Sequence, residues 1–106
     1  MGNYVKLVVF VPCNHSDKVR EAIALAGAGK LGNYDFCSFS TKGIGRFRPL
    51  PGATPSIGTT NTISSVEEEK IEVLVKRTDL PQVLNAMKLA HPYEEVAYEV
   101  YPLEHP

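Results

Sequence analysis

The sequence of 106 residues contains no tryptophan and only two cysteines, Cys13 and Cys37. A small secreted domain usually needs more than one disulfide bridge, so this scarcity favours a reducing compartment, and we expect a cytoplasmic protein. The spacing of the two cysteines matches no C-x-x-C metal or redox signature. The first residues also lack the basic and then apolar layout of a secretory signal peptide.

An excess of charge and a long apolar run are missing as well. The chain has 11 Lys and Arg against 12 Asp and Glu, a formal net charge of −1 at pH 7. This balance argues against nucleic-acid binding, whose affinity comes largely from many Lys and Arg contacts to phosphate. No apolar run approaches the roughly 20 residues that cross a bilayer, so we expect no membrane partner. The length predicts one domain over residues 1–106.

Apolar residues at alternating positions predict strands. Residues 4–12 place Val5, Leu7, Val9 and Val11 on one face of such a strand. A second strand is predicted over residues 34–41, a third from Glu68 onward, and a last one over residues 96–101.

Apolar residues at helical spacing predict two helices between these strands. The first carries Val19, Ala22, Ile23 and Ala26, and the glycines at 27, 29 and 32 are expected to end it. The second begins after Asp79, ends before Pro92 and carries Leu80, Val83, Leu84, Met87 and Ala90.

The order strand–helix–strand–strand–helix–strand predicts an α+β, ferredoxin-like sandwich: a four-stranded antiparallel sheet with both helices on one face. The other face would carry Tyr4, Val8, Phe10, Leu74 and Tyr101. Because isolated domains rarely leave such a surface wet, we expect an oligomer interface there. The alternative is that the long segment 42–65, rich in Gly, Pro, Thr and Ser, folds back over this face as a loop or small excursion.

This topology brings three distant segments to one edge of the sheet: the end of the first strand, the hairpin between strands two and three, and the end of the second helix. Cys13, His15, His91 and Glu94 lie in these segments. Imidazole, thiolate and carboxylate groups suit a divalent ion such as zinc or copper. The alternative for His91 is that it ends the second helix, where the helix dipole favours an imidazolium.

The same edge offers a candidate anion site. Cations and glycines alternate in the hairpin, so guanidinium groups and backbone N–H groups could reach a small anion; the residues are Lys42, Gly43, Gly45, Arg46 and Arg48. The alternative is a bulged hairpin with solvated charges. The serines have no base partner in the sequence, so no catalytic residue is nominated.

Specific motifs indicate a family. Residues 91–103 begin with His-Pro-Tyr-Glu-Glu and resemble the signature of the Nif-three-like (dinuclear metal centre) proteins. Residues 26–35, 45–50 and 52–55 resemble further runs of the same family, so that the match spans nearly the whole chain.

The resemblance implies the inserted domain of that family, similar in fold to the CutA and PII proteins, here standing alone. Without the metal-binding halves of larger members, the resemblance does not carry their hydrolase activity over. It implies a homo-oligomer, a trimer above all, sealed through the open sheet face. We therefore expect a non-enzymatic regulatory module that binds a small anionic ligand, a metal ion or a protein. The alternatives are a small metal-dependent hydrolase of nucleotides or phosphoesters, and a protein-interaction domain only.

Overall fold

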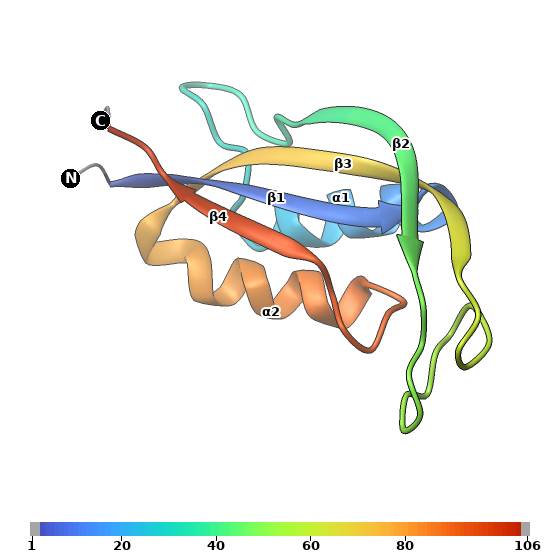
Figure 1. The fold of residues 1–106 in the computed structure, drawn as a ribbon. Coiled ribbons are helices and arrows are strands. Elements are labelled where there is room, and N and C mark those ends of the chain that lie inside the picture. Colours follow the sequence, from blue (N-terminus) through green and yellow to red (C-terminus); the bar gives the residue numbers. More distant parts are fainter. Residues whose placement is uncertain (1–2, 105–106) are drawn as a thin grey trace.

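The computed structural model describes residues 3–104 and contains four strands and two helices. A short 3-10 turn precedes each helix, over Cys13–His15 and Arg77–Asp79. The elements, shown in Figure 1, are β1 (Tyr4–Pro12), α1 (Ser16–Leu25), β2 (Phe39–Phe47), β3 (Ser64–Lys76), α2 (Leu80–Ala90) and β4 (Tyr98–Pro102).

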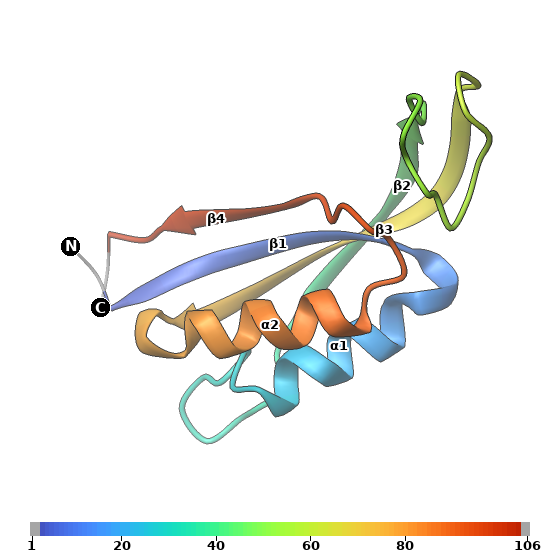
Figure 2. The same ribbon diagram turned by 90° about the horizontal axis from the view of Figure 1, so that it is seen from below.

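The four strands form one antiparallel sheet in the order β2-β3-β1-β4. Both helices lie side by side on the same face of the sheet, as Figure 2 shows from the side. The predicted ferredoxin-like arrangement is therefore confirmed. No helix within residues 3–104 has the length and apolar character that crossing a membrane requires.

The core lies between the sheet and the helices. The predicted inner face of β1 is fully buried, and Val19 and Ile23 of α1 and Val83 and Met87 of α2 pack into the same cluster. Burying side chains of this size contributes roughly 1.5–3 kcal/mol each. The period of two in β1 and the helical period in α1 and α2 thus select the buried residues as predicted.

The predicted bounds of the second strand are wrong. Residues 34–38 do not form a strand, and Phe36 adopts a left-handed backbone conformation with φ of 57°. The strand starts at Phe39 and continues through the glycines and cations to Phe47, because each of these residues pairs with β3 from Glu72 to Ser64. Hydrogen bonding to a long partner strand here overrides the weak strand preference of glycine.

Two further bounds differ from the prediction. β3 begins at Ser64 rather than at Glu68, so the irregular part of the predicted 42–65 segment shrinks to residues 48–63. β4 begins at Tyr98 rather than at residue 96, although Val96 still packs against the core. The hairpin of β2 and β3 consequently projects well beyond the helices (Figure 1).

The sheet face opposite the helices is only partly covered. An ion pair of 3.1 Å between Lys6 Nζ and Glu72 Oε1 lies on it. Phe39 and Tyr101, placed on this face by the strand register, are 69% and 47% exposed. The loop 48–63 does not fold over Phe39 or Tyr101. It lies near Phe10 instead, and residues of the loop line one cavity together with Phe10.

Candidate functional site

A cavity of about 430 Å³ lies between the β2–β3 hairpin and the segment 91–97 that leads into β4. We call it the hairpin pocket. Its volume falls within the range of small-ligand sites. The lining includes these residues with charged or polar side chains or an open backbone: Gly45, Arg46, Arg48, Ser56, Glu68, Glu94 and Glu95. Its remaining lining is aromatic and aliphatic: Phe10, Phe47, Pro49, Leu50, Ala53, Pro55, Ile57, Tyr93 and Ala97.

One carboxylate ties the hairpin loop to the segment before β4. The backbone N–H of Thr54 donates to Glu94 Oε2 at 2.9 Å, and the Thr54 hydroxyl donates to Glu94 Oε1 at 2.8 Å. Hydrogen bonds to an ionised acceptor are stronger than those between neutral groups. Thr54 and Glu94 therefore hold two walls of the hairpin pocket together across 40 residues of sequence.

Tyr93 carries the polar contact inside the hairpin pocket. Its hydroxyl donates to Glu68 Oε2 at 3.1 Å, and its ring packs at a tilt against Phe47 with centroids 5.7 Å apart. Burial first, and then the charge and hydrogen bond of Glu68, raise the pKa of Tyr93 to about 12. The phenol thus stays protonated at neutral pH and remains a donor.

His91 is buried and both its ring nitrogens are occupied. Nε2 donates to the carbonyl oxygen of Phe10 at 2.7 Å, which leaves Nδ1 to accept the N–H of Tyr93 at 3.2 Å. Burial is the main cause that lowers the pKa of His91. A neutral imidazole therefore connects the end of α2 to β1, in contrast to the imidazolium that the sequence alternative invoked.

The four predicted metal ligands do not converge in this arrangement. Cys13 and His15 lie in the turn after β1, where His15 Nδ1 is 3.0 Å from Asn14 Oδ1. Glu94 is engaged by Thr54, and His91 has no free nitrogen. Within residues 3–104, no three His, Cys, Asp or Glu side chains are grouped to hold a metal ion. These residues do not fit a zinc or copper ion as placed, and metal binding stays a prediction.

The predicted anion residues are divided between two places. Gly45, Arg46 and Arg48 line the hairpin pocket. Lys42 lies instead on the helix-facing side of β2, where its charge acts on Glu69, and Gly43 pairs with Glu68 outside the pocket lining.

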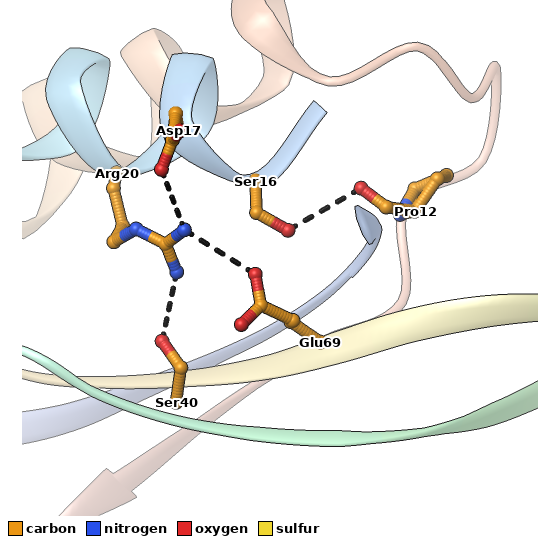
Figure 3. A network of polar contacts seen from close by, with 6 residues as sticks. All are labelled: Pro12, Ser16, Asp17, Arg20, Ser40 and Glu69. Carbon is orange, nitrogen blue, oxygen red and sulfur yellow. Dashed lines mark hydrogen bonds and ion pairs between the residues drawn. The ribbon is translucent and has the colours of Figure 1, made fainter. Parts of the chain in front are cut away.

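Arg20 anchors α1 to the two strands that form the hairpin, as Figure 3 shows. Its guanidinium donates to Ser40 Oγ at 2.8 Å, to Asp17 Oδ1 at 2.8 Å and to Glu69 Oε1 at 3.3 Å. The Ser16 hydroxyl first, and then the charge of Arg20, hold the pKa of Glu69 below its usual value, against the opposing effect of burial. The Ser16 hydroxyl donates to the carbonyl oxygen of Pro12 at 3.4 Å, a long hydrogen bond.

Sequence reasoning missed most of the hairpin pocket. The candidate residues from the sequence do not include Phe47, Glu68 or Tyr93, although Tyr93 lies within the His-Pro-Tyr-Glu-Glu motif and Glu68 within an acidic run. The available signal was strand alternation: Glu68 shares the open face of the sheet with Phe10, whereas Glu67 and Glu69 point to the other face.

Comparison with known proteins begins with a negative result, since no family model matches the chain. Curated relatives do match. The chain is 52% identical over 98 residues to a GTP cyclohydrolase 1 type 2 homolog of Halalkalibacterium halodurans, covering 92% of this chain and 26% of that protein. The corresponding protein of Bacillus subtilis is 46% identical over 99 residues, with 93% and 26% covered. The chain thus spans about a quarter of the length of these relatives.

Solved structures also resemble this chain. A Bacillus cereus protein related to NIF3 superimposes with a TM-score of 0.83 at 46% identity, over 95% of this chain and 26% of that one. CutA from Archaeoglobus fulgidus superimposes with a TM-score of 0.66 at 14% identity, over 95% and 84% of the two chains, which shows a shared fold. This chain is therefore homologous, over nearly its whole length, to one segment of the NIF3-related GTP cyclohydrolase 1 type 2 homologues, as its motifs predicted.

Proposed function

We propose that this chain is a non-enzymatic, homo-oligomeric module of the cytoplasm that binds a small anionic ligand in the hairpin pocket. The observation that carries the proposal is a cavity of about 430 Å³ with aromatic walls and two arginines, Arg46 and Arg48, in its lining. Sites for small ligands combine an apolar lining with a few placed polar groups in this way. A bound ligand that links the hairpin to the segment before β4 would give the module its regulatory output.

A binding role is favoured over a catalytic one by the contacts of the polar groups. The Tyr93 phenol is held protonated, and both ring nitrogens of His91 form hydrogen bonds with backbone groups. The alternative is a metal-dependent hydrolase of nucleotides or phosphoesters, and its support is that the curated relatives are named GTP cyclohydrolase 1 type 2 homologues. A divalent zinc or copper ion has less support than an organic anion, because two of the predicted ligands, His91 and Glu94, are engaged by other groups.

The ligand proposal is tested with anilinonaphthalene sulfonate, an aromatic anion whose fluorescence rises in apolar sites. The chain has no tryptophan, so the signal is free of indole background. We expect saturable binding that Arg48→Ala weakens about fivefold to tenfold, because one charged contact is lost. Phe47→Ala is expected to weaken binding similarly through loss of aromatic contact.

Matched controls lie outside the hairpin pocket. Lys18→Ala removes an exposed cation of α1, and Tyr34→Ala removes a ring that is 75% exposed. Both should bind the dye as the unmodified protein does. Equal binding by all four variants would contradict the assignment of the ligand site, and turnover of phosphoesters that chelators abolish would favour the hydrolase instead.

The oligomer proposal concerns the uncovered part of the open sheet face. Phe39 and Tyr101 lie on strands at opposite edges of the sheet and are 69% and 47% exposed. Light scattering at micromolar concentration should give a multiple of the 11.6 kDa chain mass, with the trimer favoured by the resemblance to CutA and PII proteins. Phe39→Glu should dissociate it by placing a charge in the interface, whereas Tyr34→Glu, in the loop before β2, should not. A monomeric mass for the unmodified chain would refute the oligomer proposal but would not bear on ligand binding in the hairpin pocket.

A further inference from the structure

Both ends of the loop that joins β2 to β3 are fixed to the hairpin. Pro49 is buried, and its carbonyl oxygen accepts the N–H of Asn61 at 2.7 Å, which closes the neck of the loop. Gly58 packs closely on Phe47, since a Cβ at residue 58 would lie only 3.2 Å from that ring. Residues 50–57 therefore run between two fixed points.

Residues 50–57 form one wall of the hairpin pocket but have few attachments to the rest of the chain. Five of them line the pocket. Within residues 3–104, the two bonds from Thr54 to Glu94 are the only hydrogen bonds that join this segment to another part of the chain. The remaining backbone bond is internal to the segment, because the N–H of Ala53 donates to the carbonyl oxygen of Leu50 at 3.0 Å.

The turn at the start of this segment is not packed against its surroundings. Gly52, in that turn, has a φ of +99°, and a Cβ there would meet no atom within 4 Å. Thr54 and Glu94 are both exposed, so water can replace either partner when their bonds break. Segments with exposed hydrogen bonds and few buried apolar contacts open at a much lower free energy than the whole domain. Residues 50–57 can therefore move away from the pocket while β2 stays paired with β3.

Resting on the proposed function of the hairpin pocket, we propose that residues 50–57 are a lid and that the two bonds between Thr54 and Glu94 form the latch that holds it closed. With the latch closed, the half-buried residues on either side of Thr54, Ala53 and Pro55, lie in the wall of the pocket. With the latch broken, the lid leaves this wall and opens a path for the ligand. Opening of such a lid sets the rates at which a ligand enters and leaves.

Hydrogen exchange of single backbone amides, followed by NMR without any ligand, tests the latch. Thr54→Val removes the hydroxyl bond to Glu94 and leaves the bond from the backbone N–H. If the two bonds act as one latch, the protection factor of the amide at position 54 should fall about fivefold, because the remaining bond opens more often. The amide of Asn61, in the neck of the loop, should keep its protection factor. The matched variant Thr60→Val, outside the lid, should leave both amides unchanged.

The kinetics of dye binding test whether the latch controls access to the hairpin pocket. Glu94→Ala removes both acceptors of the latch. The rate constants for association and for dissociation of anilinonaphthalene sulfonate, measured by stopped-flow fluorescence, should therefore both rise about fivefold to tenfold. The dissociation constant should change less than either rate constant, because the lid limits entry and exit alike. The matched variant Glu95→Ala removes the same charge from the same lining, so comparing the two variants cancels the effect of that charge on an anionic dye.

The outcomes separate this inference from the proposed function. An unchanged protection factor at position 54 in Thr54→Val would overturn the latch. Dye rate constants that are equal in Glu94→Ala and Glu95→Ala, or a rise in the dissociation rate constant alone, would show that the segment is not a lid. In both cases the ligand-binding function stands as long as Arg48→Ala and Phe47→Ala weaken dye binding. If neither of these two variants changes dye binding, the proposed function fails, and with it the role of the lid in admitting a ligand.

Discussion

Replacing Arg20 by alanine is expected to lower the free energy of unfolding by about 2–3 kcal/mol, with a fall of roughly 8–15 °C in Tm. The guanidinium joins α1 to β2 through Ser40 and to β3 through Glu69 (Figure 3). The side chains of Arg20 and Glu69 are 27% and 14% exposed, so alanine leaves a largely desolvated carboxylate without its cation. The partial exposure places the loss below that of a fully buried pair.

The pH dependence of this loss identifies its cause. Hydrogen bonding from Ser16 and the charge of Arg20 lower the pKa of Glu69 from its ordinary 4.5. Ionised Glu69 therefore contributes stability that is present above pH 4.5 and disappears as the pH falls through the lowered value. The difference in Tm between the unmodified protein and Arg20→Ala, measured by thermal unfolding, should become smaller as the pH falls from 6 to 3.

Asp17→Ala provides the control for Arg20. Asp17 is the fully exposed partner of the same guanidinium, so its loss should leave Tm unchanged within error. An Arg20→Ala variant as stable as Asp17→Ala, or a gap that stays constant with pH, would show that the guanidinium does not anchor the helix.

Replacing Gly29 by alanine is expected to cost about 2–4 kcal/mol, because two penalties act on one residue. Gly29 has a φ of +78°, a conformation that disfavours side chains, and a Cβ there would meet the backbone N of Cys37 at 2.9 Å and its carbonyl oxygen more closely still. The residue also donates to Leu74 O at 2.7 Å and accepts from Cys37 N at 2.9 Å. Alanine would push the loop before β2 away from β3.

Gly32→Ala is the matched control in the same loop. Gly32 also has a positive φ, of +57°, but its Cβ would meet no atom within 4 Å. Only the conformational penalty remains, about 1 kcal/mol. Urea unfolding of the two variants should therefore separate them by at least about 1 kcal/mol at similar m-values. Equal urea midpoints for the two variants would mean that Cys37 can move to accommodate the added Cβ with no loss of stability.

The buried face of each long element was predictable from the sequence. Val5, Leu7, Val9 and Val11 alternate in β1 and are all buried, and the stripe of α2 around Val83 and Met87 is buried as well. The order of elements then limits the topology, since strand–helix–strand units are right-handed. The same reasoning places the hairpin near residues 91–95, and the bonds of Thr54 to Glu94 confirm this proximity.

Residues 27–47 show where local patterns fail. The glycines after α1 follow the end of the helix at Leu25 as predicted, but Gly29 is also required by a contact with Cys37, eight positions later in the sequence. Aromatic residues at 34, 36 and 39 suggest a strand, yet only Phe39 pairs with β3. Local propensity gives a weak preference in such segments, whereas every residue of β2 has a partner in β3, and alternate residues of β2 form backbone hydrogen bonds to it.

The scarcity of cysteine and the balanced charge bear on compartment and partners, whereas the periodic apolar positions determine the fold class: an α+β domain whose buried faces follow from side-chain spacing alone. Tertiary structure alone decided the site. Strand register brings Glu68 against Gly45, and the packing of the segment after α2 brings it to Tyr93. The ring of His91 is unavailable to a ligand because its Nε2 is bonded to the carbonyl oxygen of Phe10. Spacing along one element can be read from the sequence, but distances between elements depend on how all of them pack together.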